Sequence, residues 1–325
     1  MEDLIVKIND RCNFACEFCS SSNIAADHKD LPITKLLDYL KNNEVNSVIV
    51  NGGDPLCTSP EYYEELLKFR DENCPNTDIS FTTNLLAFWK DPDKWTPILK
   101  RVGVCTSFQY GKKRKLATGE VYTEEMFREV FKLFEERIGY KLTFIAVIDE
   151  DNEDTVIETV QLAKELGTTC KINPCLRSGR AWNEYPFARM FERYLDIIEA
   201  GLSDYEASNK LIQKAWRNKF EICPFLMDCS GIKCMSPSGI VTKCGSISDD
   251  IMKPGFIPDY FLGKADKAPY HCTVLGNDCY SCEFHGICNS CHKRIMDIRD
   301  GGYEAEHCVN MHAQLERAKK VLGDK

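Results

Sequence analysis

The chain has 325 residues, with 41 Lys and Arg against 50 Asp and Glu, which gives a formal net charge of −9. It lacks the basic blocks that bind phosphate backbones, so nucleic acid is not expected as a partner. It shows no N-terminal signal and no apolar run of about 18 residues, so we expect a cytoplasmic protein that does not bind membranes.

The first half alternates short β-branched runs with amphipathic helical patterns. The predicted strands cover residues 4–9, 47–51, 78–83, 103–109, 141–147 and 170–173. The predicted helices between them include 59–73, 123–138 and 154–166. Strands that alternate with helices predict an α/β fold with a parallel sheet, closed into a partial (β/α)6, TIM-like barrel. In such a fold the loops after the strands carry the catalytic groups.

The pattern changes after residue 180. Residues 195–216 are predicted to be helical with a break near Gly201, and residues 311–322 are predicted to form a closing helix. Residues 223–308 are rich in Cys, Gly, Pro and Ser with little periodicity, and such a segment needs metal to fold. We therefore expect a barrel over 1–180, a helical linker over 181–227, and a small cysteine-rich cluster domain over 228–325.

Cysteine is abundant, with 18 residues against 6 histidines. Without an export signal, clustered cysteines more often bind metal than form disulfides. No closely spaced histidine pair accompanies them in the sequence. Thiolates without imidazole favour iron–sulfur clusters or four-thiolate zinc sites.

Cys12, Cys16 and Cys19 are spaced Cys-x3-Cys-x2-Cys directly after the first predicted strand. Three thiolates on one loop can hold three irons of a cubane cluster and leave the fourth iron open to a small molecule. Half of a zinc site and buried free cysteines are the alternatives. The position after strand one, where α/β folds bind ligands, favours the cluster.

With the aromatic Phe18 before the last cysteine, this motif resembles the signature of the radical S-adenosylmethionine (SAM) enzymes. The resemblance implies that the open iron chelates the amino and carboxylate groups of SAM. An electron from the cluster would then cleave SAM to methionine and a 5′-deoxyadenosyl radical, which abstracts a hydrogen atom from the substrate. Phe18 would contact the adenine.

Further motifs follow the next strands in the order that this resemblance requires. Gly52-Gly53-Asp54-Pro55 resembles the family's Gly-Gly-Glu-Pro, which receives the methionine amino group; here Asp54 replaces the usual glutamate. The glycines would let the backbone approach the cofactor. Thr82-Thr83-Asn84 resembles Thr-Asn-Gly, and Ser107 and Gln109 stand where similar enzymes carry a serine and an acid near the ribose. Each motif alone is also typical of a turn.

A second cysteine region begins at Cys229. It resembles the SPASM extension of radical SAM enzymes, which holds two auxiliary clusters, although two residues rather than three separate Cys288 from Cys291. The resemblance implies an inner cluster on Cys229, Cys234, Cys244 and Cys291, and an outer cluster on Cys279, Cys282, Cys288 and Cys308. Gly239 would permit a hairpin between Cys234 and Cys244. Two four-cysteine zinc sites are the alternative.

Two other features complete the pattern. Residues 176–181 contain a Gly-Arg-Ala sequence that is common after the sixth strand in these enzymes, so the resemblance spans nearly the whole chain. Cys175 and Cys223 are candidate catalytic residues, because a thiol that faces the substrate can return a hydrogen atom to a carbon radical. Core filling is the alternative for both thiols.

SPASM-type enzymes chiefly modify peptides or protein side chains. We therefore predict an oxidoreductase that epimerises, crosslinks or oxidises a peptide residue, with three [4Fe-4S] clusters, SAM, and a reducing partner of the flavodoxin or ferredoxin type. Because the chain starts at strand one, any leader recognition is expected from elsewhere in the fold or from a partner. The alternatives are a radical SAM enzyme that acts on a small molecule such as a sugar or amino acid, and a non-catalytic iron–sulfur or zinc protein.

Overall fold

The structure, a computed structural model, describes residues 2–20, 29–177, 179–181, 184–218, 231–245 and 259–323. It divides into two compact units. Unit 1 comprises Met1–Ile145, Ser178–Trp182 and Ser230–Phe256; unit 2 comprises Ala146–Arg177, Asn183–Cys229 and Ile257–Lys325. No helix in the described ranges is long and apolar enough to cross a bilayer.

All six predicted strands are present. They are β1 (Glu2–Lys7), β2 (Val45–Asn51), β3 (Asp78–Thr82), β4 (Gly103–Ser107), β5 (Thr143–Ile148) and β6 (Cys170–Pro174). Neighbouring strands from β1 to β5 pair in parallel. Among the described residues the strands form one sheet in the order β6-β5-β4-β3-β2-β1-β7-β8. The predicted α/β partial barrel is confirmed.

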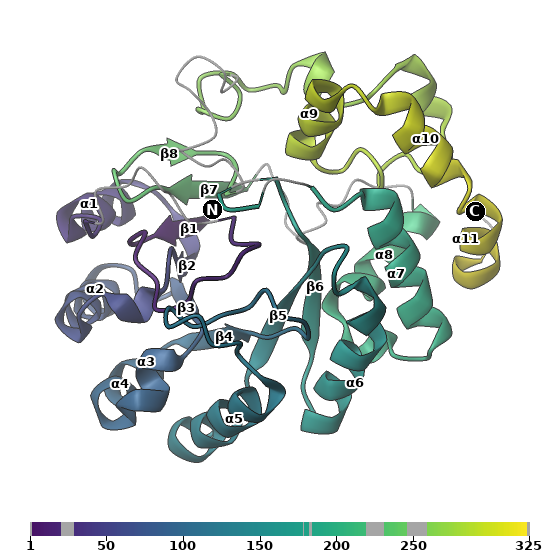
Figure 1. The fold of residues 1–325 in the computed structure, drawn as a ribbon. Helices are drawn as coiled ribbons and strands as arrows, with labels where there is room; N and C mark the ends of the chain where they lie inside the picture. Colours follow the sequence, from purple (N-terminus) through teal and green to yellow (C-terminus); the bar gives the residue numbers. More distant parts are fainter. Residues whose placement is uncertain are drawn as a thin grey trace. The chain divides into compact units, whose positions relative to one another are not determined.

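The helices of unit 1 lie outside the curve of its strands (Figure 1). They are α1 (Ile33–Asn42), α2 (Pro60–Asn73), α3 (Leu86–Lys90), α4 (Pro92–Leu99) and α5 (Glu124–Ile138). In α5, the Thr123 hydroxyl caps the N-terminus by accepting from Met126 N–H, and Gly139 at φ 98° ends the helix. Its buried face includes Phe127, whose ring stacks on Phe108 with the centroids 4.6 Å apart.

The cysteine-rich region also contributes to the sheet of unit 1. Strand β7 (Ile232–Met235) pairs in parallel with β1, with Cys234 opposite Ile5, and β8 (Val241–Thr242) returns antiparallel to β7. Gly239, at φ 83°, lies in the turn between them, and its N–H donates to the Ser236 carbonyl at 2.8 Å. The predicted hairpin is confirmed, but its pairing with β1 was not predicted, because strands this short show too little alternation in sequence.

Unit 2 contains the remaining helices, starting with α6 (Val156–Leu166), α7 (Phe187–Glu199) and α8 (Ala207–Asn218). The predicted break near Gly201 is confirmed, with Gly201 at φ 68°. The single closing helix predicted over 311–322 is wrong in its bounds, because α10 (Glu304–His312) and α11 (Leu315–Leu322) are separate. Helix α9 (His292–Gly301) was not predicted, because Lys293 and Arg294 occupy buried positions and disguise its amphipathic pattern.

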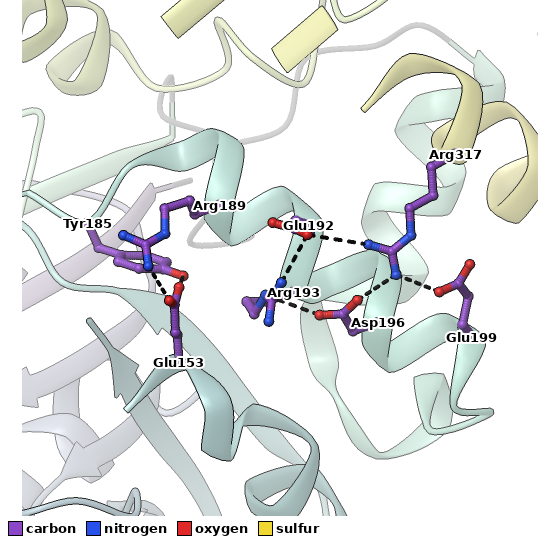
Figure 2. A network of polar contacts seen from close by, with 8 residues as sticks. All are labelled: Glu153, Tyr185, Arg189, Glu192, Arg193, Asp196, Glu199 and Arg317. Carbon is purple, nitrogen blue, oxygen red and sulfur yellow. Dashed lines mark hydrogen bonds and ion pairs between the residues drawn. The ribbon is translucent and has the colours of Figure 1, made fainter. Parts of the chain in front are cut away.

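A polar network fixes α11 to α7 within unit 2 (Figure 2). Arg317 of α11 donates to Asp196 and Glu199 of α7, in each case at 2.5 Å. The end of α11 is anchored to α8 as well, because the indole N–H of Trp216 donates to the Gly323 carbonyl at 2.8 Å. The C-terminal segment is therefore held by specific contacts as well as by apolar burial.

Candidate functional site

Cys12, Cys16 and Cys19 lie on the loop that follows β1 in unit 1. Main-chain bonds hold this loop against residues 113–117, which follow β4. The N–H groups of Ala15 and Glu17 donate to the carbonyls of Lys115 and Lys113, at 2.7 and 3.0 Å. The cysteine loop thus has a strand-like partner far away in sequence, which fixes its backbone.

The three thiols share one electrostatic environment. Cys12 is exposed at the surface of its loop, but desolvation by the surrounding protein atoms raises its pKa, and the Asp54 carboxylate and the other two thiols raise it further. Burial also raises the pKa of Cys16, while the Arg114 guanidinium opposes that shift. The Sγ of Cys12 accepts from the Phe14 N–H at 3.4 Å and lies 3.6 Å from Nδ2 of Asn84. These donors favour the thiolate, the form that binds metal.

The loop after β2 packs directly on the loop after β1. Gly53 N–H donates to the Asn9 carbonyl, and Asp54 N–H donates to the Arg11 carbonyl, both at 2.7 Å. A Cβ on Gly52 would lie 2.5 Å from the Asn9 oxygen, and one on Gly53 only 2.0 Å from the Arg11 oxygen. The glycines were predicted to permit approach to a cofactor; in the structure the approach they permit is to the backbone of residues 9–11.

Asp54 connects the loops after β2 and β3. It is 2% exposed, and its carboxylate accepts from Leu56 N–H at 2.9 Å, from the Thr83 hydroxyl at 2.9 Å and from Asn84 N–H at 2.7 Å. Burial raises its pKa to about 6, against these hydrogen bonds, which lower it. Both carboxylate oxygens therefore have partners within the protein, and Asp54 positions Asn84 beside Cys12.

The end of β4 carries a buried polar group that includes one residue the sequence analysis missed. The guanidinium of Arg114 donates to Gln109 Oε1 at 2.9 Å and to the Ser107 hydroxyl at 2.8 Å, and it lies 5.1 Å from the Phe18 ring centroid. Arg114 is only 4% exposed. It belongs to the run Lys112-Lys113-Arg114-Lys115, which is typical of a solvated surface, so only the tertiary structure distinguishes it.

The Gly-Arg-Ala segment lies beside the cysteine loop. Gly179 is at φ 61°, and Arg180 N–H donates to the Cys19 carbonyl at 3.0 Å. In unit 1, therefore, the loops after β2 and β4 and this segment all contact the loop that carries the three cysteines. Ser178 lies outside the described residues.

The inner set of cysteines is only partly described. Cys234 is buried on β7, and its Sγ lies 3.6 Å from the position of a Cβ on Gly245, the residue after Cys244. The hairpin thus brings Cys234 and the Cys244 region together in unit 1. Cys291, in unit 2, is buried at the start of α9. Cys229 lies outside the described residues, as does the candidate catalytic Cys223.

The outer set is gathered at one pocket of unit 2, which is lined by Cys279, Cys282, Cys288 and Cys308. Burial raises the pKa of Cys288 to about 12, and the other three thiols add to this shift. Two histidines that the sequence analysis did not connect with the cysteines contact this set. His307 Nε2 lies 2.9 Å from Cys288 Sγ, and His312 Nε2 lies 3.5 Å from Cys282 Sγ.

Within the described ranges, no three His, Cys, Asp or Glu side chains converge closely enough to hold a single metal ion. The thiolates of a cubane cluster each bind a different iron, so they stand farther apart than the ligands of one ion. The outer set offers four neighbouring thiols around one pocket, and the N-terminal loop offers three. Both donor sets therefore fit the iron–sulfur clusters expected from the sequence.

Cys175 lies directly after β6 and is 4% exposed. Its thiol lies 4.0 Å from the Leu176 carbonyl oxygen, and its backbone N–H donates to the Ile148 carbonyl at 2.8 Å. This burial is compatible with core filling as well as with the predicted catalytic role.

Comparison with known proteins gives one family and two kinds of relative. The model described as the radical SAM superfamily matches residues 6–163. The GTP 3′,8-cyclase of Staphylococcus epidermidis strain RP62A is 22% identical over 232 residues, which cover 66% of this chain and 59% of that protein. The GTP 3′,8-cyclase of Staphylococcus carnosus is 27% identical over 183 residues, or 51% of each. The chain thus spans less than two thirds of these relatives.

Two solved structures share the fold over most of the chain. Streptococcus suis SuiB bound to the precursor peptide SuiA has a TM-score of 0.61 at 18% identity, and the match covers 88% of this chain and 70% of that one. Native anSMEcpe, with bound AdoMet and the Cp18Cys peptide, has a TM-score of 0.64 at 14% identity, and the match covers 98% of both chains.

Proposed function

We propose, from the premise that residues 6–163 form a radical SAM domain, that this chain generates a 5′-deoxyadenosyl radical and uses it to modify a residue of a peptide. One observation carries the proposal: the loop with the three cysteines is contacted by the loops after β2, β3 and β4, each of which bears a motif of the family. The contacts are Gly53 to Asn9, Asn84 to Cys12, and Arg114 to Phe18.

In this proposal Cys12, Cys16 and Cys19 hold the catalytic [4Fe-4S] cluster. SAM is bound on the surrounding loops, in contact with Phe18, Asn84, Ser107 and Gln109. Gly52, Gly53 and Asp54 shape this site from behind, through the backbone of residues 9–11 and through Asn84. When bound, the cluster and SAM supply the radical that abstracts a hydrogen atom from the substrate. The chain's own contribution includes the Phe14 N–H and the Asn84 amide, which stabilise the thiolate of Cys12. Asp54 contributes by holding Asn84 in place.

Charge balance supports a binding role for Arg114. A buried guanidinium requires a counter-charge, but the side chains it contacts in the described part of the chain, Ser107, Gln109 and Phe18, are neutral. The thiolate of Cys16, on which Arg114 acts, and the methionine carboxylate of SAM would supply the missing charge. Asn51, at the end of β2, has a buried Oδ1 without a hydrogen-bond partner among the described residues and could accept from the SAM amino group.

The peptide substrate is supported by the fold shared with SuiB and anSMEcpe, whose structures contain peptides. A small-molecule substrate is the second candidate, because the chain is also similar to GTP 3′,8-cyclases. To separate them, the protein would be incubated with SAM, dithionite, and either GTP or peptides encoded beside its gene. A mass change in a peptide supports the first candidate, and a modified nucleotide supports the second.

We also propose that the C-terminal cysteines form a SPASM-type extension with two auxiliary clusters, an inner one on Cys229, Cys234, Cys244 and Cys291 and an outer one on Cys279, Cys282, Cys288 and Cys308. The gathering of the outer thiols around one pocket supports this. The same proposal includes a barrel domain over 1–180, a helical linker over 181–227 and a cluster domain over 228–325. It also includes a reducing partner of the flavodoxin or ferredoxin type. The auxiliary clusters would accept or relay an electron, or position the substrate.

The central test is SAM cleavage by anaerobically reconstituted protein with dithionite. We expect release of 5′-deoxyadenosine from the wild type and none from a Cys12→Ala, Cys16→Ala, Cys19→Ala triple variant. Cys74→Ala, which removes a thiol outside all three proposed sets, is the matched control and should cleave SAM at the wild-type rate. Cleavage by the triple variant would refute the assignment of the catalytic cluster.

We further propose that a cysteine thiol donates a hydrogen atom to the substrate. Cys175, or Cys223 in its place, would return a hydrogen atom to the substrate radical, as epimerisation requires. The thiyl radical left on the cysteine would be returned to the thiol by one electron from an auxiliary cluster and one proton from solvent. In deuterated water the wild type should place one deuteron at the inverted carbon. Cys175→Ala or Cys223→Ala should continue to cleave SAM without giving product. Normal product from both variants would favour crosslinking or oxidation instead.

A further inference from the structure

Helix α9 of unit 2 carries a buried cation that the proposed function does not use. Arg294 is 2% exposed, and its Nε, Nη1 and Nη2 atoms are all buried without a hydrogen-bond partner in the part of the chain that is described. Its closest carboxylate oxygen, on Glu184, is 3.8 Å from Nε, and the Phe187 ring centroid is 3.8 Å from the guanidinium carbon. Glu184 supplies one counter-charge without a hydrogen bond, so the guanidinium N–H groups remain available to a further negative partner.

The proposed outer cluster lies close enough to be that partner. Arg294 lines one pocket of unit 2 together with His307. His307 is 5% exposed, and its Nε2 is 2.9 Å from Cys288 Sγ. An N–H on this nitrogen would donate a hydrogen bond to the thiolate of Cys288.

We propose that Arg294 and His307 are positioning residues that raise the reduction potential of the outer auxiliary cluster. Arg294 acts as its buried counter-charge, and His307 donates a hydrogen bond to the thiolate of Cys288. This inference rests on the proposed outer cluster of Cys279, Cys282, Cys288 and Cys308.

The physical basis is the charge of the cluster. Reduction adds a negative charge, so a nearby cation and a hydrogen bond to sulfur both stabilise the reduced state more than the oxidised one. Because Arg294 is buried, water screens this effect only weakly. A raised potential would suit the outer cluster to accept an electron.

The test is an EPR-monitored redox titration of the reconstituted full chain in the Cys12→Ala, Cys16→Ala, Cys19→Ala background, so that only the auxiliary clusters contribute. We expect Arg294→Gln to move one midpoint to a more negative value, with a tenfold change in the reduction equilibrium, or about 59 mV for one electron. Arg294→Lys should retain most of the wild-type potential. His307→Phe should shift the same midpoint downward, and His307→Gln, which keeps an N–H donor, should restore part of it.

The matched control is Arg189→Gln. Arg189 lines the same pocket as Arg294 and His307, but its guanidinium pairs with Glu150 and Glu153, so its loss should leave both midpoints unchanged. Unchanged midpoints in Arg294→Gln and His307→Phe would overturn the inference. If Arg294→Gln fails to assemble, an unchanged midpoint in His307→Phe overturns it.

If the proposed auxiliary clusters do not exist, metal analysis will show it before any titration. Iron, sulfide and zinc are therefore measured first in the Cys12→Ala, Cys16→Ala, Cys19→Ala protein. Zinc in place of iron there would remove the auxiliary clusters themselves, and the inference with them. Intact clusters with unshifted potentials would remove only the roles of Arg294 and His307.

Discussion

At the scale of single residues, Asp54 shows how a buried carboxylate organises a site without facing solvent. Its oxygens receive hydrogen bonds from Leu56, Thr83 and Asn84, and Asn84 in turn reaches Cys12. The usual glutamate of this motif is one methylene longer. The shorter side chain is fully engaged by the protein, so its effect on a cofactor is expected to act through Asn84.

The raised pKa of Asp54 predicts a pH-dependent stability. Its pKa is about 6 in the folded protein against an ordinary value of 3.8, so the folded state binds more protons between these values. Stability should therefore fall as the pH rises from about 4 to about 6, by up to ~3 kcal/mol from this group. Urea unfolding of the metal-free protein at several pH values measures this. In Asp54→Asn the unfolding free energy should lose this part of its dependence on pH. The same dependence on pH in the variant and the wild type would contradict the prediction.

At the scale of elements, the loop after β2 depends on the absence of a side chain at Gly53. In Gly53→Ala the new Cβ would lie 2.0 Å from the Arg11 carbonyl oxygen, a backbone atom that cannot yield without moving the cysteine loop. We expect a loss of about 3 kcal/mol or more in unfolding free energy, since overpacking costs this much where the backbone must shift. The variant should also bind less iron at Cys12, Cys16 and Cys19.

The control for this prediction is Gly103→Ala in β4. There the closest atom to the new Cβ would be the Ser80 Cβ, at an ordinary distance of 3.4 Å. Its iron content should match the wild type. If Gly53→Ala and Gly103→Ala had the same unfolding free energy and the same iron content, the contact between the loops after β1 and β2 would not hold the cysteine loop in place.

The junction of α7 and α11 tests a different kind of contact (Figure 2). Arg317 contacts Asp196, Glu199 and Glu192, and its side chain is 29% exposed. Because the network is partly solvated, Arg317→Ala should cost only about 1 kcal/mol in unfolding free energy, and less in high salt. The exposed pair Lys132 and Glu136, 3.9 Å apart, is the comparison: Lys132→Ala should change stability by less than about 0.5 kcal/mol. An Arg317 effect that salt leaves unchanged would argue against an ionic contribution.

At the scale of the whole molecule, the cofactor content is the decisive quantity. Three cubane clusters on the assigned thiolates require about twelve irons per chain after anaerobic reconstitution. Metal analysis with sulfide determination measures this directly. About four irons, or zinc in the C-terminal sites, would contradict the two auxiliary clusters. The Cys12, Cys16, Cys19 triple variant should retain about eight irons, because its other ligands are unchanged.

The sequence by itself determined the order and kind of the elements in the barrel and the location of the cysteine sets. Alternating apolar patterns and loop cysteines are local properties, so strands such as Asp78–Thr82 and the motif at Cys12 could be predicted without knowing what they contact. The helices of the cysteine-rich region could not, because α9 places Lys293 and Arg294 inside and so breaks the local pattern.

Only the tertiary structure decided which residues meet. In the sequence Arg114 is one of four consecutive basic residues, but in the structure it is buried against Ser107 and Gln109. In the sequence His307 is an isolated histidine, but in the structure its ring contacts Cys288. The physical reason is the same in both cases. The charge state and the partners of a buried polar group depend on its surroundings, which segments distant in sequence supply only when the chain folds.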